Sequence, residues 1–421
     1  MPKQQFRNTF YTNDNLYVLS GLNSGLVDLI YLDPPFNTKR TFSAPAGSKA
    51  AGASFKDMWT WNDVDEYYLD TLAATFPALT TFIACAGEIH GKPMAAYLTY
   101  MSQRMVEMYR ILKETGSLYL HCDPTAGHYL KILLDEIFGK NNCRNEIVWC
   151  YTGPGSSGMR QFNRKSDTIF WYSKGKTWTF NKDVVRMPYK DGKPHRGGFV
   201  EKDGTRLVPD KYSAGKVPEN WWTDIAIVAR GKHERTGYPT QKPLALLKRI
   251  ILASSHKGDI VMDPFCGCAT TCVAAQQLDR RWIGIDIEKQ AVKVLAERLS
   301  ADTGLVKDFA AAEQVPKRSD LKTVLPSSSV KKQLYREQQG KCNACGEELG
   351  GEDWDADNFE GQHLNIDYII PKSKGGGDYY ENYQLLCAHC NRIKAKRPME
   401  YLRLKTETRK RRTKNTIFWG E

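Results

Sequence analysis

Apolar runs and amphipathic segments alternate through the first 300 residues of the chain. Short runs rich in strand-forming residues, such as VDLIYL, predict buried strands, and apolar residues at helical spacing predict helices. The predicted strands are 27–32, 116–123, 259–263 and 281–287. The predicted helices are 97–112, 128–138, 244–254 and 288–299. This alternation is typical of a doubly wound, Rossmann-like α/β sheet.

Three stretches interrupt the alternation. Residues 43–54 (SAPAGSKAAGAS) are rich in Gly, Ala and Ser, which predicts a mobile loop. Glycine, proline, lysine and aromatic residues dominate 151–235 and predict an irregular insertion, and 301–329 is composed like a linker. We therefore expect two halves of one α/β domain at 1–150 and 236–300, the insertion at 151–235, the linker at 301–329 and a small module at 330–421.

The positive charge of the chain is concentrated in two regions. The formal net charge is +12, and residues 392–414 hold eleven Lys or Arg against two Glu. Residues 151–235 hold seventeen against nine acids, interleaved with twelve aromatic residues. This combination favours a polyanionic partner, with nucleic acid as the first choice and a merely solubilising surface as the alternative.

The rest of the composition narrows the class of protein. We find no apolar run of membrane-spanning length, no signal peptide and no lipidation motif, so we expect a cytoplasmic protein with no membrane partner. Four of the eleven cysteines form the pairs CNAC (342–345) and CAHC (387–390), and seven are scattered. This distribution indicates metal ligation and buried thiols in a reducing compartment, and argues against a disulfide framework.

The first motif with chemical meaning follows the predicted strand 27–32. It reads DPPF, with Asp33, Pro34, Pro35 and Phe36. Proline fixes φ and removes a backbone donor, so a rigid turn follows the strand. This turn carries a carboxylate, backbone carbonyls available as acceptors, and an aromatic ring.

A second motif has the geometry of a nucleotide-binding βαβ unit. In DIVMDPFCGCATT (259–271) a strand ends in an acid, passes a turn with Gly267 and enters a helix. The next strand, in RRWIGIDI, ends at Asp286 about twenty residues later, where an acid can bond ribose hydroxyls. The three-glycine dinucleotide fingerprint is missing, so a ribose-containing cofactor without a pyrophosphate fits better.

Together with YPTQKP (238–243), these motifs resemble the S-adenosylmethionine-dependent DNA amino-methyltransferases of the permuted β class, over roughly residues 8–300. The resemblance implies a methyltransferase sheet with the target-recognition insertion in its middle. It implies that Asp33 and a main-chain carbonyl at Pro34–Pro35 accept the two hydrogens of the target amine. Phe36 would stack on the base, which must leave the duplex to be reached.

The resemblance also assigns residues to the cofactor, S-adenosylmethionine. Asp263, Phe265 and Gly267 would line it, Asp286 would bind its ribose, and Thr240, Gln241 and Lys242 would reach its methionine end. Asp14 would approach the adenine ring, unless Asn13-Asp14 simply forms a turn. His121 and Asp123 follow a predicted strand and either border the site or serve the structure. Many relatives carry glycine where this chain has Ala269.

Basic residues of the insertion are candidates for contacts to DNA phosphates or base edges, although many will be solvated surface. They are Arg160, Arg164, Lys165, Arg186, Lys190 and Arg196.

The two cysteine pairs give four thiolates, as a closed structural zinc site requires: Cys342, Cys345, Cys387 and Cys390. The segment 366–394 between and after them resembles the HNH nuclease module, a ββα unit that holds one divalent ion against a phosphate. Asp367 and Asn391 match the ligands of that ion, here Mg²⁺ or Mn²⁺, and Asn382 matches the middle asparagine. Tyr368 stands where the family has its histidine base, and an unperturbed tyrosine, with a pKa of about 10, is a poor base at neutral pH.

We therefore expect a DNA adenine-N6 methyltransferase with an appended HNH-like, zinc-stabilised DNA-binding module whose cleavage is impaired or lost. The same enzyme acting on cytosine N4 is one alternative, because both amines need the same geometry. A bifunctional restriction–modification enzyme and a binding protein with a degenerate transferase fold are the others. The expected partner is double-stranded DNA in the nucleoid, and the sequence leaves open whether the chain forms a homodimer.

Overall fold

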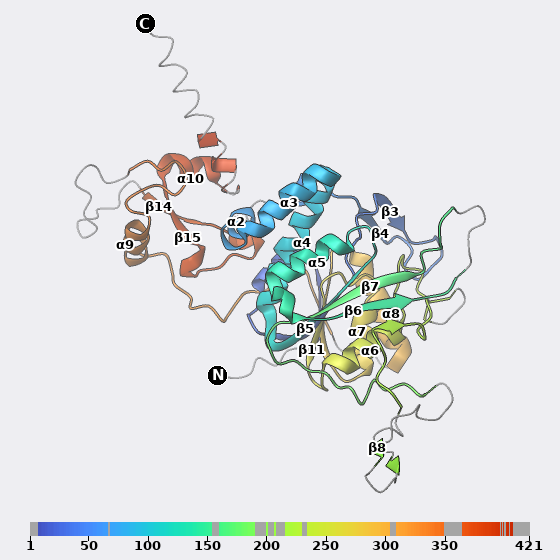
Figure 1. Ribbon diagram of the computed structural model, residues 1–421. Coiled ribbons are helices and arrows are strands. Elements are labelled where there is room, and N and C mark those ends of the chain that lie inside the picture. Colours follow the sequence, from blue (N-terminus) through green and yellow to red (C-terminus); the bar gives the residue numbers. More distant parts are fainter. Residues whose placement is uncertain are drawn as a thin grey trace. The chain divides into compact units, whose positions relative to one another are not determined.

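A computed structural model describes most of the chain (Figure 1). The described residues are 7–65, 68–153, 160–189, 199–200, 206–207, 215–229, 234–303, 309–348, 364–395, 397, 399, 401–403 and 405–406. The chain divides into two compact units. The sheet unit draws on residues 1–15, 24–58 and 108–314, and the module unit draws on residues 16–23, 59–107 and 315–421.

A nine-stranded sheet forms the centre of the sheet unit, in the order β10-β6-β7-β5-β2-β11-β12-β1-β13. Only β7 runs antiparallel to its neighbours among the described strands of this sheet. The strands are β1 (Thr9–Thr12), β2 (Val27–Leu32), β5 (Leu112–Cys122), β6 (Cys143–Cys150), β7 (Ser166–Ser173), β10 (Trp221–Trp222), β11 (Ile260–Asp263), β12 (Arg281–Asp286) and β13 (Ala310–Ala312). The predicted α/β class is confirmed.

Strand register brings the predicted motifs to one edge of this sheet. Ile30 of β2 is opposite Met262 of β11, and Leu32 is opposite Leu120 of β5. The carboxyl ends of these three parallel strands therefore lie together, and ligands bind at this edge in open α/β sheets. Asp33 and Asp263 both lie there.

Helices cover both faces of the sheet. The helices are α5 (Gly127–Leu134), α6 (Leu244–Ser254), α7 (Thr270–Gln277) and α8 (Lys289–Thr303). Buried residues of α6, α7 and α8 share one core with Trp171 of β7. The next residue, Tyr172, points to the opposite face because side chains alternate along a strand. There it packs on Phe138, in the π-helical turn 135–139 that follows α5.

Residues 43–54 do not form the mobile loop that their composition predicts. They connect β3 (Arg40–Ser43) and β4 (Ser54–Asp57), an antiparallel hairpin, and Ala50 and Ala53 are buried. Small side chains allow this close packing, so the same composition that indicates a loop here permits a docked turn. Strand β7 lies inside the predicted insertion 151–235 and belongs to the main sheet, and β13 lies inside the predicted linker. Two further two-residue strands are β8 (Phe199–Val200) and β9 (Arg206–Leu207).

The module unit contains a ββα element near its carboxyl end. Strands β14 (Leu364–Tyr368) and β15 (Tyr383–Cys387) pair antiparallel, and α10 (Ala388–Lys394) follows directly. This is the ββα element that the resemblance to the HNH module predicts. The other helices assigned to this unit for most or all of their length are α1 (Asn15–Gly21), α2 (Leu69–Thr75), α3 (Pro77–His90), α4 (Lys92–Ile111) and α9 (Ser328–Glu337). No helix in the described part of the chain is long and apolar enough to cross a membrane.

Candidate functional sites

Asp33 follows β2 directly and enters the site at the carboxyl edge of the sheet. Its Oδ2 accepts a hydrogen bond of 2.5 Å from Lys242 Nζ, and its Oδ1 is buried without a partner among the described residues. Lys242 Nζ also lies 5.5 Å from the centre of the Phe36 ring, which is half-buried. The site therefore combines a carboxylate oxygen with unused acceptor capacity, a positive charge and a partly exposed aromatic ring.

A hydrogen-bonded chain of side chains lies behind Phe36. The His121 ring stacks on Phe36, with centroids 6.3 Å apart and planes at 22°. His121 is fully buried, and its Nε2 donates to Asp167 Oδ2 at 3.0 Å because a carboxylate only accepts. Its Nδ1 lies 2.9 Å from the Tyr31 hydroxyl, and Tyr151 donates to the other oxygen of Asp167 at 3.2 Å. The ring that supports Phe36 is thus held on both sides.

Charge in this chain of residues is set by burial and by the neighbours. Burial opposes ionisation of Asp167, but its hydrogen bond to His121 and the Lys242 charge outweigh burial and lower the pKa of the carboxyl below its usual value. Burial, reinforced by the Asp33 charge, raises the pKa of Tyr31 well above its usual value. Asp167 therefore stays an acceptor and Tyr31 a donor. Asp167 was not predicted, although the apolar run TIFWY that follows it is a recognisable strand signal.

The predicted cofactor loop joins β11 to α7 and is held by two acids. Asp263 accepts from the Phe265 backbone N–H at 3.0 Å and from the Thr271 hydroxyl at 2.6 Å. Asp286, at the end of β12, accepts from the Gly267 N–H at 2.7 Å and from the Glu288 N–H at 2.8 Å. Burial raises the pKa of Asp263 to about 7 and that of Asp286 to about 6, because these hydrogen bonds only partly compensate for desolvation.

Backbone conformation explains the glycine and the alanine of this loop. Gly267 has φ +51°, and a Cβ there would come 3.0 Å from the Tyr238 ring. Ala269, the residue directly before α7 (Thr270–Gln277), adopts the left-handed conformation with φ 60° and ψ 33°. The chain therefore keeps the left-handed turn without glycine, at a cost of about 1 kcal/mol or more.

The residues predicted to reach the methionine end of a cofactor lie between Tyr238 and α6. Gln241 Oε1 accepts from the Thr236 N–H at 2.8 Å, and its Nε2 donates to the Glu234 carbonyl at 2.8 Å. Thr240 has φ +60°, and Lys242 turns to Asp33. Asp14 follows β1, and its N–H donates to the Asn13 side chain. Contacts of these four residues with a cofactor stay a prediction.

In the module unit, four cysteine sulfurs lie within 4.8 Å of one another, in a group that could hold a metal ion. They belong to Cys342, Cys345, Cys387 and Cys390. The Cys387 N–H donates to Cys342 Sγ at 3.3 Å, and the Cys390 N–H donates to Cys387 Sγ at 3.4 Å. Backbone donors to sulfur favour thiolates, which are the form that binds zinc.

The residues that match the HNH positions have protein partners. The buried Asp367 carboxylate accepts from Lys394 at 2.9 Å and from Gln384 at 2.8 Å, and Lys394 is fully buried. On the opposite side of β14, Tyr368 donates to Asp378 at 2.7 Å. Asn382 bonds the Ile370 N–H and carbonyl, and Asn391 lies on α10. A lysine ammonium therefore neutralises the carboxylate predicted to bind a divalent ion.

Comparison with known proteins decides the family. The profile of the family described as DNA methylase matches residues 27–298, and that of the HNH endonuclease family matches residues 342–397. The first match covers more than half of the chain. The chain belongs to the DNA methylase family. It carries an HNH endonuclease domain at its carboxyl end, so both predicted resemblances are confirmed.

The methylase has named relatives. It is 28% identical over 316 residues to the DNA adenine methyltransferase YhdJ of Escherichia coli, covering 75% of this chain and 88% of the relative. It is 34% identical over 207 residues to the type II methyltransferase M.HpaI of Haemophilus parainfluenzae, covering 49% and 60%. Among solved structures, the PvuII DNA methyltransferase (cytosine-N4-specific) is 13% identical, covering 73% of this chain and 95% of that chain with a TM-score of 0.45.

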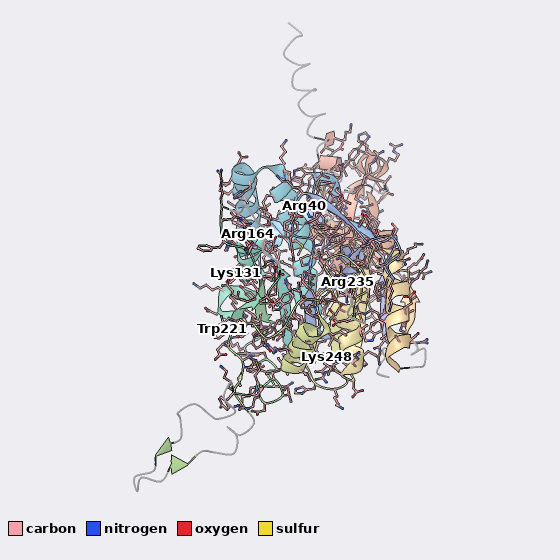
Figure 2. All side chains as sticks on the ribbon, turned by 90° about the vertical axis from the view of Figure 1, so that its right-hand side faces the viewer. Arg40, Lys131, Arg164, Trp221, Arg235 and Lys248 are labelled. Carbon is pink, nitrogen blue, oxygen red and sulfur yellow. The ribbon has the colours of Figure 1, made fainter. Side chains whose placement is uncertain are left out.

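The basic residues predicted to bind DNA are only partly described. Arg160, Arg164 and Lys165 lie between β6 and β7, and Arg164 is exposed. Figure 2 shows Arg164 and Arg40 toward the upper end of the methylase sheet unit, with Trp221 and Lys248 lower down. Arg186 donates to Asp183 at 2.8 Å and to the Gly215 carbonyl at 2.7 Å, which indicates a structural use. Lys190 and Arg196 lie outside the described residues.

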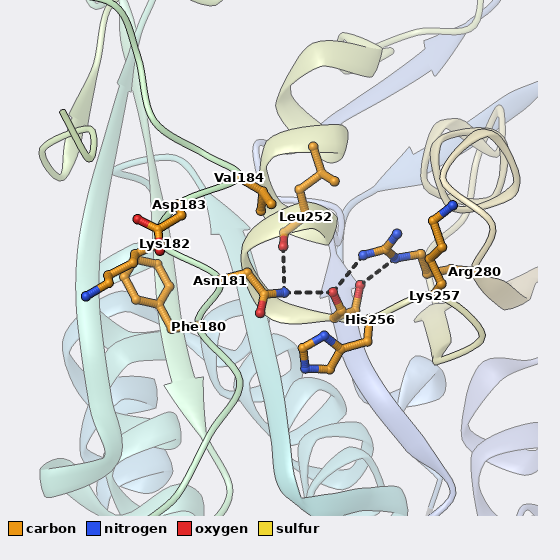
Figure 3. A pocket seen from close by; sticks show the side chains of 10 residues that line it. Phe180, Asn181, Lys182, Asp183, Val184, Leu252, His256, Lys257 and Arg280 are labelled. Carbon is orange, nitrogen blue, oxygen red and sulfur yellow. Dashed lines mark hydrogen bonds between the residues drawn. The ribbon is translucent and has the colours of Figure 1, made fainter. Parts of the chain in front are cut away.

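The methylase also has a surface pocket away from the carboxyl edge (Figure 3). Arg280 and Asn181 line it, near the amino ends of β11 and β12. Arg280 donates to the Ser255 carbonyl at 2.7 Å, and Asn181 donates to the carbonyls of Leu252 at 3.0 Å and Ser255 at 2.9 Å. These polar groups are used to hold the carboxyl end of α6. We therefore assign the pocket no ligand.

The raised pKa of Asp263 predicts a pH-dependent stability of the cofactor-free methylase. Folded Asp263 holds a proton up to about pH 7, whereas the ordinary value of the carboxyl is 3.8. The stability that this proton contributes is present at low pH and is lost as the pH rises through about 7. Relative to Asp263→Asn, the wild-type Tm should fall by a few degrees between about pH 5 and about pH 8. Differential scanning fluorimetry checks this, and a Tm difference independent of pH would contradict it.

Proposed function

We propose that this methylase transfers the methyl group of S-adenosylmethionine to the N6 amine of adenine in DNA. The observation that carries the proposal is the buried Oδ1 of Asp33, which has no partner among the described residues and lies in the same loop as the half-exposed Phe36. An exocyclic amine bound against Phe36 can donate one hydrogen to this oxygen. A carbonyl of the rigid Pro34–Pro35 turn would accept the other.

These contacts would change the chemistry of the amine. Its lone pair is delocalised into the base, and two acceptors on its hydrogens favour a tetrahedral nitrogen whose lone pair is free to attack. Positive charge develops on this nitrogen during the transfer, and the Asp33 carboxylate stabilises it. Lys242 holds Oδ2, which leaves Oδ1 as the oxygen that would accept from the amine. The base is an extruded one, since the amine is inaccessible within a duplex.

The residues at the carboxyl edge fit the proposed cofactor. The left-handed turn at Gly267 brings backbone close to the edge, and a Cβ there would meet Tyr238. Asp286, at the end of β12, is the acid expected to bind the ribose hydroxyls. The cofactor has no pyrophosphate, so the site does not require a loop that binds one. Asp263, Phe265 and Gly267 would hold the cofactor with Asp286. When bound, it supplies an electrophilic methyl group on a sulfonium.

Adenine is preferred over cytosine because the relatives include a protein named DNA adenine methyltransferase. The test is to incubate unmethylated DNA with the protein and S-adenosylmethionine, digest it to nucleosides and weigh them. We expect N6-methyladenine in the wild-type reaction and about a hundredfold to a thousandfold less of it with Asp33→Ala. If the product is N4-methylcytosine, the target base is cytosine and not adenine. If no methylated nucleoside is formed, the proposal is refuted.

We further propose that the HNH domain holds a structural zinc ion on its four cysteines and binds DNA without cutting it. The proposal is supported by the side chains that already occupy the two groups a nuclease would use, the carboxylate of Asp367 and the hydroxyl of Tyr368. Lys394 neutralises Asp367, and the Tyr368 hydroxyl is engaged by Asp378, where Lys372 also donates at 2.7 Å. A divalent ion at Asp367 would have to displace a buried ammonium, which costs several kcal/mol.

This proposal predicts the outcome of a cleavage assay. Supercoiled plasmid incubated with Mg²⁺ or Mn²⁺ should remain uncut. Gel shift of the same DNA should weaken when salt is raised. If discrete fragments form and disappear in both Asp367→Ala and Asn391→Ala, the chain is instead a bifunctional restriction–modification enzyme.

A further inference from the structure

The β3–β4 hairpin, whose sequence predicts only a mobile loop, connects the two parts of the proposed active site. Its final residue, Asp57, is 1% exposed. The Asp57 carboxylate accepts from the Asn37 N–H at 2.6 Å, from the Thr38 N–H at 2.9 Å and from the Thr38 hydroxyl at 2.5 Å. Asn37 and Thr38 are the two residues directly after Phe36.

The backbone that Asp57 binds is in an unusual conformation. Asn37 has φ 62° and Lys39 has φ 61°, so two non-glycine residues near the end of the motif are left-handed. Such residues each cost about 1 kcal/mol or more unless surrounding contacts hold them. The three hydrogen bonds to Asp57 and the bond from the Lys39 N–H to the Asp57 carbonyl at 2.8 Å supply those contacts.

Strand β4 and the turn of the hairpin are docked on the predicted cofactor side of the edge. Phe55 stacks on Tyr238 with planes at 13°, and Tyr238 is the ring next to Gly267. The Ala50 N–H donates to the Thr236 carbonyl at 3.1 Å.

The turn is also packed in a small apolar cluster. Ala50 and Ala53 share it with Cys268 of the cofactor loop and Val294 of α8. Gly237 has φ +86°, and a Cβ there would come 2.3 Å from the Ser48 Cβ. The turn therefore fits closely, and the hairpin has a fixed base from which Asp57 acts.

We propose that Asp57 is a positioning residue for methyl transfer, resting on the proposed function of Asp33 and Phe36. The docked hairpin uses the Asp57 carboxylate to fix the backbone after Phe36. That contact sets the direction of the Phe36 ring and of the turn carbonyls. Asp57 touches neither the base nor the cofactor in this role, and it acts entirely through residues 37 and 38.

The test compares Asp57→Ala and Asp57→Asn with wild type, and Ser43→Ala in the same hairpin serves as the control. Asp57→Ala should lower kcat about a hundredfold, because small misplacements of reacting groups cost that much. The Kd for S-adenosylmethionine, measured by calorimetry, should change less than about threefold. Asp57→Asn keeps the shape and one acceptor but turns an NH₂ toward the other backbone N–H, so its loss should be intermediate. Ser43→Ala should match wild type.

Hydrogen–deuterium exchange gives a readout that does not depend on activity. Peptides that cover residues 34–39 should exchange at least about tenfold faster in Asp57→Ala, because two protected amides lose their acceptor. Unchanged exchange, or kcat within about threefold of wild type, overturns the inference. A parallel fall of kcat, cofactor affinity and Tm overturns it as well, because it indicates general destabilisation. Failure of wild type to methylate DNA refutes the proposed function separately.

Discussion

Replacing Asp33 by alanine should lower kcat for methyl transfer by about a hundredfold to a thousandfold, the usual cost of removing one group that stabilises developing charge in a reaction. In the described part of the chain, the variant removes the carboxylate that bonds Lys242 Nζ, and with it the free Oδ1. Transfer of radioactive methyl groups to DNA at saturating cofactor measures the effect. Cofactor affinity should change less than kcat, because the described residues expected to line the cofactor, Asp263, Phe265, Gly267 and Asp286, have no hydrogen bond to Asp33; Lys242, which bonds Asp33, is the exception.

Glu114→Ala is the matched control for this experiment. Glu114 is an acid of the same unit, its side chain is 79% exposed, and its ion pair with Lys174 lies at the surface. Lys174 is only 12% exposed and keeps its hydrogen bond to the Leu112 carbonyl, whereas the lost carboxylate is largely solvated, so activity should be unchanged. If Asp33→Ala retained methyl transfer within about tenfold of wild type, another group would have to accept the hydrogens of the amine.

Replacing Cys390 by serine should remove zinc and unfold the ββα element. Cys390 is fully buried, and the four sulfurs lie close enough to share one ion. Structural zinc contributes about 10 kcal/mol or more of folding free energy in small domains, which exceeds the stability that a short ββα element can supply alone. Metal analysis should show about one zinc per chain in wild type and almost none in the variant.

Hydrogen–deuterium exchange of backbone amides shows which part of the protein unfolds in Cys390→Ser. Amides of β14, β15 and α10 should lose their protection in Cys390→Ser, whereas amides of β2 and β11 should keep theirs. Cys85→Ser carries the same change at an exposed thiol outside the cluster and should behave like wild type. Full zinc content in Cys390→Ser, or unchanged protection of β14, would show that the cysteines do not hold the element together.

The contiguous motifs of this chain were readable from sequence because each carries its own chemistry. DPPF, DPFCGCATT and the two cysteine pairs contain both the reactive groups and the turns that present them, and the sheet places the first two at one edge. The residues that support them were not readable. Asp57 acts on positions 20 residues away, Asp167 on a histidine 46 residues away and Lys242 on an acid 209 residues away.

Composition pointed to the wrong structure at two places, for different physical reasons. A stretch of Gly, Ala and Ser describes a flexible loop or a tightly docked turn equally well, and only tertiary contacts decide between them at residues 43–54. Strand β7 is flanked by polar, basic residues that hid its apolar run. The choice between adenine and cytosine has a different origin, since both amines need the same acceptors.

The first strand of the sheet has a consequence for how the protein is made. Strand β1 pairs with β12 and β13, whose residues follow it by about 270 to 300 positions. At ordinary rates of synthesis its partners leave the ribosome on the order of ten to sixty seconds later. Contacts this distant in sequence slow folding and leave apolar strands exposed meanwhile. Chains released before Arg281 would contain DPPF yet lack a complete sheet edge, so unfinished copies are expected to be inert and short-lived.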